Sequence, residues 1–125
     1  MNCSMKLIFT DDEGNRFFGK GPVMLLKGID RLHSINKAAS EMFLSYYKAL
    51  KIIKNAEEGF GFPLLKRTSG GKNGGGSVLT DEARELIRLY DTLEKETGDF
   101  LNKSFDRIFC DFTKQVGQKQ VNTDR

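Results

Sequence analysis

Positively charged side chains gather in the middle third of the chain. The residues from Ser34 to Leu79 include seven lysines and arginines but three glutamates, a net charge of +4, while the whole chain of 125 residues carries +3. A local excess of this kind suits a polyanion such as nucleic acid, and a solvated basic face is the alternative that composition leaves open. The elements that hold these cations therefore decide what they can bind.

Other kinds of site chemistry have little support in the sequence. His33 is the only histidine, and no acid or cysteine stands at a motif spacing from it, which argues against a catalytic triad or a zinc site. The acids at 11–13 are too few for an EF-hand loop and are expected in a turn. Gly71 and Lys72 are followed by Asn73 and a strand, which argues against a Walker-type phosphate loop. We therefore expect no enzyme activity, no cofactor and no metal.

The composition is that of a globular domain. Hydrophobic residues make up 38% and charged residues 30%, too apolar for a disordered chain. No apolar run approaches the roughly 20 residues that cross a bilayer, and the N-terminus does not have the pattern of a secretory signal. Cys3 and Cys110 form no motif and are expected to be reduced. We expect a cytoplasmic protein that does not bind membranes.

Apolar spacing predicts the elements that position the cations. Apolar residues recur every three or four positions in four segments, which is typical of helices. Ser34, Ser45 and Thr80 precede three of these segments and are expected to cap their first turns. The expected elements, in chain order, are strands at 5–10 and 16–18, helices at 22–32, 34–42 and 45–58, strands at 64–68 and 77–79, and a long helix from 81.

The second and third helices are joined by residues 43–44 alone, which predicts a helix-turn-helix. Ala38 and Ala39 are small enough for another helix to approach closely. The third helix has lysines on its exposed side, so it is the candidate recognition helix that enters the major groove of a duplex. Ser45 and the first helical amides suit a phosphate, and Lys54, further along, is expected on the backbone.

A β-hairpin with a glycine-rich tip follows the third helix and carries further cations. Residues 69–76 (SGGKNGGG) are expected to form a long, flexible tip. Glycines let a chain lie close to a sugar-phosphate backbone, so the hairpin is expected to act as a wing on the backbone or minor groove. The candidate DNA-binding residues of helices and wing are Ser34, Lys37, Ser45, Tyr46, Tyr47, Lys48, Lys51, Lys54, Lys66, Arg67, Lys72 and Asn73.

The last helix carries an aromatic stripe that is too long for three short helices to cover. A second copy of the chain would bury it, which predicts a homodimer. The alternative is a break at Gly98 that folds the helix back onto its own domain. Two copies also suit paired half-sites on DNA. The expected dimer contacts are Leu86, Ile87, Tyr90, Leu93, Phe100, Leu101, Phe105, Ile108, Phe109 and Phe112.

Four segments carry a family resemblance, in this order: SINKAA at 34–39, LSYYKAL at 44–50, PLLKRTSGGKNGGGSVLT at 63–80 and TDEARELIRLY at 80–90. Over roughly 21–93 the chain resembles the N-terminal DNA-binding domain of the molybdate-responsive (ModE-type) bacterial regulators, relatives of the LysR-type regulators. The resemblance implies a homodimeric transcription factor with the third helix on DNA, a wing at 66–76 and the long helix in the dimer interface. Full-length members carry C-terminal molybdate-binding domains, and no SARNQ-like anion motif occurs here. We therefore do not expect molybdate sensing, and the small-molecule effector is unknown.

The sequence thus predicts a mainly α fold with a small β component, a winged helix-turn-helix with a long C-terminal dimerisation helix. We expect a DNA-binding domain at 1–80, a dimerisation helix at 81–116 and a flexible tail at 117–125. The expected function is sequence-specific regulation of transcription through binding of double-stranded DNA as a homodimer. The alternative is a winged-helix adaptor that binds proteins and not DNA.

Overall fold

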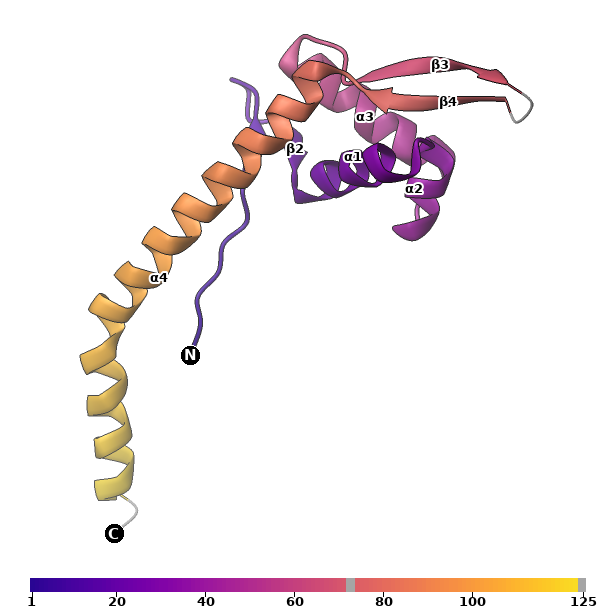
Figure 1. Ribbon diagram of the computed structural model, residues 1–125. Coiled ribbons are helices and arrows are strands. Elements are labelled where there is room, and N and C mark those ends of the chain that lie inside the picture. Colours follow the sequence, from indigo (N-terminus) through magenta and orange to yellow (C-terminus); the bar gives the residue numbers. More distant parts are fainter. Residues whose placement is uncertain (72–73, 124–125) are drawn as a thin grey trace. The chain divides into compact units, whose positions relative to one another are not determined.

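The computed structural model describes residues 1–71 and 74–123, and within them the chain forms four helices and two antiparallel hairpins (Figure 1). The first hairpin joins β1 (Ile8–Thr10) to β2 (Arg16–Gly19), and the second joins β3 (Leu65–Gly71) to β4 (Gly74–Leu79). The helices are α1 (Lys20–Leu32), α2 (Ile35–Glu41), α3 (Tyr46–Phe60) and α4 (Asp81–Thr123). The expected fold class, mainly α with a small β component, is confirmed.

The chain divides into two compact units, Lys6–Asp91 and a second unit made of Met1–Met5 with Thr92–Arg125. We expected a boundary at residue 80, yet the first turns of α4 belong to the core of the first unit. Ala83 is fully buried there. The core of this unit is apolar and continuous, and it collects side chains from all three short helices, β2, β4 and the start of α4.

Tyr90 is a core residue of the first unit, and our expectation that it contacts a second copy of the chain is wrong. Its side chain is 2% exposed, and its ring packs against Phe9 and Phe18. The hydroxyl donates to the carbonyl oxygen of Leu7 at 3.4 Å, which satisfies its polar end. Leu86 and Ile87 are half-buried against the same core.

The close approach of α1 and α2 follows from small residues on both helices. Ala38 is 1% exposed, and a Cβ added to Gly28 of α1 would lie 3.1 Å from the Ala38 Cβ. Gly28 therefore contributes to packing, which offsets the lower helix propensity of glycine. The expected role of the small residues in α2 is confirmed at Ala38.

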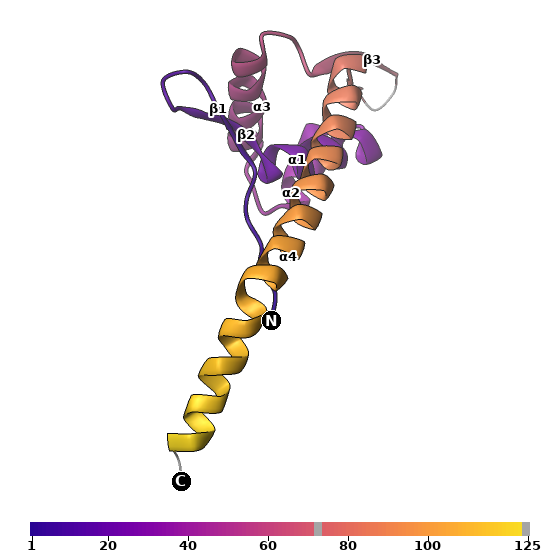
Figure 2. The ribbon, with the colours of Figure 1, turned by 90° about the vertical axis from the view of Figure 1, so that its left-hand side faces the viewer.

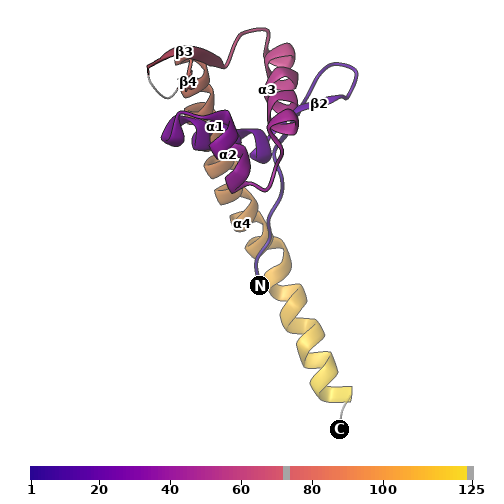
Figure 3. The same cartoon turned by 90° about the vertical axis from the view of Figure 1, so that its right-hand side faces the viewer.

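The two hairpins lie on different sides of the short helices. Figures 2 and 3 show β1 and β2 beside α3, while β3 and β4 lie on the other side of α1. We expected residues 69–76 to form a long loop, but the strands extend to Gly71 and begin again at Gly74, and Gly71 pairs with Gly74. The glycines here continue the backbone ladder across an irregular register, because pairing needs only their N–H and C=O groups.

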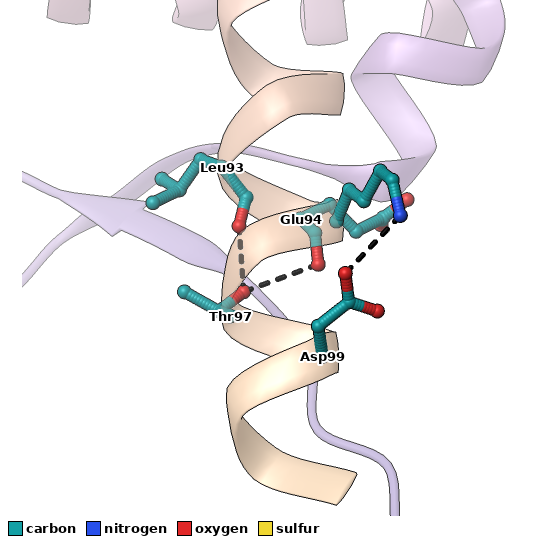
Figure 4. Close-up of polar contacts among 5 residues, drawn as sticks. Leu93, Glu94, Thr97 and Asp99 are labelled. Atoms are coloured by element: carbon teal, nitrogen blue, oxygen red, sulfur yellow. Dashed lines mark hydrogen bonds and ion pairs between the residues drawn. The ribbon is translucent and has the colours of Figure 1, made fainter. Parts of the chain in front are cut away.

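Helix α4 is continuous through Gly98, so the alternative in which the chain breaks and folds back there is wrong. The Thr97 hydroxyl donates to the carbonyl oxygens of Leu93 and Glu94 at 2.7 and 3.2 Å, and Lys95 pairs with Asp99 at 3.1 Å (Figure 4). The Lys95–Asp99 pair spans Gly98, and the penalty of a glycine in a helix interior is only about 1 kcal/mol.

Helix α4 also runs past residue 116, where we expected it to end, and reaches Thr123. The segment at 115–120 (QVGQKQ) is rich in good helix formers and contains no proline, which explains the extension. Nowhere in residues 1–71 and 74–123 is a helix both long and apolar enough to cross a bilayer.

Candidate nucleic-acid interface

Helix α2 begins at a serine cap, as the sequence predicts. Ser34 has an extended backbone, and its Oγ accepts a hydrogen bond from the Lys37 amide at 3.1 Å. The inner face of α2 consists of Ile35, Ala38 and Ala39, all buried, which directs Lys37 to the exposed side. The helix is therefore oriented by its apolar residues, and its lysine is available to a ligand.

The turn between α2 and α3 is a Schellman motif closed by an aromatic residue. The Leu44 amide donates to the Ala39 carbonyl at 2.9 Å, and the Phe43 amide donates to the Ser40 carbonyl at 3.1 Å. Phe43 occupies the position that usually holds glycine, and its φ is 57°. An L-residue in this left-handed region is roughly 1–2 kcal/mol less favourable than in the right-handed region. The turn is tight and fixed, so it sets the direction in which α3 starts.

Helix α3 separates an apolar inner face from a basic outer face. Ser45 caps it by accepting from the Lys48 amide at 3.1 Å, and Ala49, Ile53 and Ala56 are buried. The outer face is exposed and borders a shallow groove of about 720 Å³. The candidate residues that line this groove are Tyr47, Lys48, Lys51 and Lys54.

The β3–β4 hairpin is attached at its root to the turn between α1 and α2. The Ser77 amide donates to the His33 carbonyl oxygen at 3.0 Å. A Cβ at Gly76 would lie 2.6 Å from that oxygen, so only glycine fits without displacement. Lys66 and Arg67 on β3 are exposed. The expected wing residues Lys72 and Asn73 lie outside the described residues.

A polar hollow brings the three elements of the candidate site together. Its volume is about 330 Å³, and it lies where the starts of α2 and α3 meet the root of the hairpin. Ser34, Tyr46 and Arg67, all candidates from the sequence, line it. The structure therefore brings one candidate residue from each of the two helix starts and one from β3 around a single hollow.

The cations of this surface are unpaired, in contrast to many others in the chain. In the described part of the chain, none of Lys37, Lys48, Lys51, Lys54, Lys66 and Arg67 has a carboxylate within 4.0 Å. The pairs that do form are Lys27–Asp91, Arg31–Glu41, Arg84–Asp30, Arg88–Glu85 and Lys95–Asp99. Among the described residues these cations thus form no ion pair, and Glu58 is the one acid that lines the groove beside them.

Glu41, the one acid of α2, is paired with an arginine of α1. Its two oxygens accept hydrogen bonds from the Arg31 guanidinium at 3.0 and 2.6 Å. These hydrogen bonds lower the pKa of Glu41 and raise the pKa of Arg31. The pair is exposed and therefore adds little to stability. The Arg31 charge does, however, compensate the negative charge of Glu41, which lies at the end of α2 just before the turn to α3.

A family model for bacterial regulatory helix-turn-helix proteins of the LysR family matches residues 23–84, from α1 to the first turn of α4. The match identifies a LysR-type helix-turn-helix domain within these residues. The LysR-type domain therefore contains every candidate DNA-binding residue that we named, from Ser34 to Asn73. A crystal structure of VV2_1132, a LysR family transcriptional regulator, matches with a TM-score of 0.51 at 19% identity, over 71% of this chain and 27% of that one. That likeness supports the fold.

Curated relatives confirm the resemblance to ModE-type regulators. Transcriptional regulator ModE of Haemophilus influenzae is 45% identical over 73 residues, which cover 58% of this chain and 29% of the relative. The DNA-binding transcriptional dual regulator ModE of Escherichia coli K12 is 37% identical over 89 residues, covering 71% of this chain and 32% of the relative. The chain thus spans about a third of the length of these relatives.

Three features of the LysR-type domain were not foreseen from the sequence. They are the bond from Ser77 to the His33 carbonyl, the requirement for glycine at position 76, and the left-handed conformation of Phe43. The hairpin contact joins segments more than forty positions apart, so no local pattern signals it. The turn was detectable in principle, because a two-residue link between helices commonly needs a left-handed residue.

Proposed function

We propose that this chain is a transcriptional regulator that binds double-stranded DNA through its LysR-type domain. The observation that supports this most directly is the unpaired basic face of α3 next to the exposed cations of β3. The E. coli relative is named a DNA-binding transcriptional regulator, which agrees with this assignment. The molybdenum-related names of other relatives are not carried over, since about two thirds of their length has no counterpart in the alignment.

In this proposal α3 enters the major groove with its N-terminal end. Ser45, Tyr46, Tyr47, Lys48 and Lys51 reach bases or the adjoining backbone, because the first turns of a recognition helix lie closest to base edges. Lys54 binds phosphate further along the groove. Ser34 and Lys37 contact the backbone from α2. Lys66, Arg67, Lys72 and Asn73 form the wing contact.

We also propose that two copies pair through the distal part of α4. Apolar side chains within the second unit are widely exposed: Phe100 is 72%, Ile108 56% and Phe112 57% exposed. A stripe of this size on a helix of a monomer is unusual, and a second copy of the same helix is a partner of matching chemistry. The other expected contacts in this distal part are Leu93, Leu101, Phe105 and Phe109, and the ring centroids of Phe105 and Phe109 lie 5.2 Å apart in a stacked arrangement.

The pairing is tested by sedimentation equilibrium. The native chain should have twice the monomer mass of 14.1 kDa, and a double variant, Phe100→Asp with Phe112→Asp, should have the mass of one chain. Cys110→Ser is the control, because this residue lies off the apolar stripe. A monomeric native chain at micromolar concentration would contradict the pairing.

The DNA-binding proposal is tested by measuring duplex affinity over a range of salt concentrations. We expect affinity to fall steeply with salt, because lysines and arginines release counterions from phosphates. Lys48→Ala should weaken binding by roughly 1–3 kcal/mol if it reads a base. Lys103→Ala, an exposed lysine of α4, should leave affinity unchanged. Absence of duplex binding at low salt would contradict the proposal and favour the protein-binding adaptor.

A further inference from the structure

Phe43 has two features that the fold of its own chain does not explain. Its φ of 57° lies in the left-handed region, where glycine or asparagine is more stable. Its side chain is 98% exposed, the largest value among the exposed large hydrophobic residues of the described chain. The ring thus gains nothing from burial in its own chain. A strained residue of this kind points to a role with a partner.

The surroundings of Phe43 indicate the chemistry of that partner. The residue stands two positions before Ser45, the cap of α3, so the ring lies at the N-terminal end of the proposed recognition helix. Tyr46 and Tyr47, three and four positions further along the chain, are 43% and 74% exposed. The cations nearest in the chain, Lys37 and Lys48, have no acidic partner among the described residues. The unpaired lysines favour a polyanion, and the exposed ring favours a partner with apolar atoms. A polyanion that also has apolar atoms would satisfy both.

Duplex DNA has apolar atoms at the edge of its major groove, namely the C5-methyl groups of thymine and the carbons of deoxyribose. We propose that Phe43 packs on this apolar edge and contributes a preference for thymine at one position of the binding site. The inference rests on the proposed function, because it assumes that α3 binds in the major groove. The ring supplies contact area and no charge, and the lysines of α3 supply the attraction to phosphate.

The test compares Phe43→Gly, Phe43→Asn and Phe43→Tyr in the full chain. The glycine and asparagine variants should fold at least as stably as the native chain, since both residues tolerate a positive φ. Both should nevertheless bind duplex DNA roughly tenfold more weakly, because the apolar contact is lost. The tyrosine variant should retain most of the affinity. The dependence of binding on salt should be the same in all three, since no charge is removed.

A second measurement uses duplexes in which deoxyuridine replaces thymidine, which removes only the C5-methyl groups. The native chain should bind these duplexes more weakly than thymine-containing ones, and Phe43→Gly should bind the two alike. Equal binding of native chain and glycine variant to thymine-containing DNA would overturn the role of Phe43 while leaving the DNA-binding proposal intact. Failure of the native chain to bind any duplex would overturn both.

Discussion

The two hairpins of the first unit, Lys6–Asp91, are both antiparallel but are attached to the unit in different ways. The β1–β2 hairpin is anchored by aromatic rings: Phe18 is 3% exposed and lies 4.9 Å from Phe60 and 5.5 Å from Phe9 between ring centroids. The β3–β4 hairpin is anchored mainly at its root, where Ser77 bonds to the His33 carbonyl. Its exposed cations have no acidic partner among the described residues.

The difference separates residues that fold the unit from residues that are available to a ligand. The first hairpin gives its apolar side chains to the core and leaves an acidic turn at residues 11–13. The second hairpin gives Leu79 to the core and bonds through its backbone to a neighbouring turn, and it leaves Lys66 and Arg67 in solvent. Substitutions of the buried rings of the first hairpin should therefore change stability, and substitutions of the exposed cations of the second should change binding.

The largest effect is expected at Phe18. Phe18→Ala removes a buried ring that contacts three others, so it should lower the free energy of unfolding by roughly 3–5 kcal/mol. Chemical denaturation followed by circular dichroism measures this. Thr10→Ala, an exposed position on the same hairpin, should change stability by less than about 0.5 kcal/mol. A loss below 1 kcal/mol for Phe18→Ala would contradict the anchoring role of the aromatic rings.

A smaller loss of stability is expected at Gly76, where the second hairpin is attached. Gly76→Ala places a Cβ 2.6 Å from the His33 oxygen and should destabilise the unit by roughly 1–3 kcal/mol while weakening duplex binding. Gly21→Ala is the matched control, because a Cβ there meets nothing within 4 Å. If Gly76→Ala left both thermal stability and duplex affinity unchanged, the root contact would not position the hairpin.

Removal of charge from the second hairpin should affect binding and spare stability. Arg67→Ala should change the free energy of unfolding by less than about 0.5 kcal/mol, because the side chain is exposed and unpaired among the described residues. The slope of log affinity against log salt should become shallower by about 1, the value for one lost phosphate contact. Asp12→Ala on the first hairpin should leave the slope as it is. Equal slopes for Arg67→Ala and the native chain would contradict the wing contact.

The smallest effect is expected at the acidic turn and depends on pH. Asp11 accepts hydrogen bonds from the Asn15 and Glu13 amides, each at 2.9 Å, and the bond from Asn15 contributes most to lowering the pKa of Asp11 below its ordinary 3.8. A lowered pKa in the folded state stabilises the fold above the unfolded pKa, and this contribution is lost as pH falls through the folded pKa. Chemical denaturation between about pH 6 and pH 2 should therefore give a higher free energy of unfolding for the native chain than for Asp11→Ala, and this difference should disappear only at the acid end. A difference in the free energy of unfolding that persists unchanged at the lowest pH would contradict the role of the carboxylate.

Local patterns in the sequence predict the elements of the fold well. The caps Ser34, Ser45 and Thr80 are confirmed by hydrogen bonds from the amides of Lys37, Lys48 and Ala83. Each follows from the residue type and the apolar periodicity behind it. The exposed side of α3 follows from the same periodicity, so the basic face of the candidate site was predictable as well.

Features that depend on tertiary contacts were not predictable in this way. Tyr90 has the spacing of a dimer contact, and only the position of β1 and β2 shows that it is buried in its own unit. The glycines around the wing resemble a loop in composition, yet backbone pairing extends the strands through them. Gly98 is of a residue type that often breaks helices, but good helix formers lie on both sides and α4 continues through it.

Selection of bound sequences from a random duplex pool, with the full chain at moderate salt, tests the central claim most directly. We predict enrichment of a palindromic sequence whose half-sites lie about one helical turn apart, because two copies of α3 would read the same groove on one face of the duplex. Recovery of a pool with no enriched sequence would contradict sequence-specific binding by this surface.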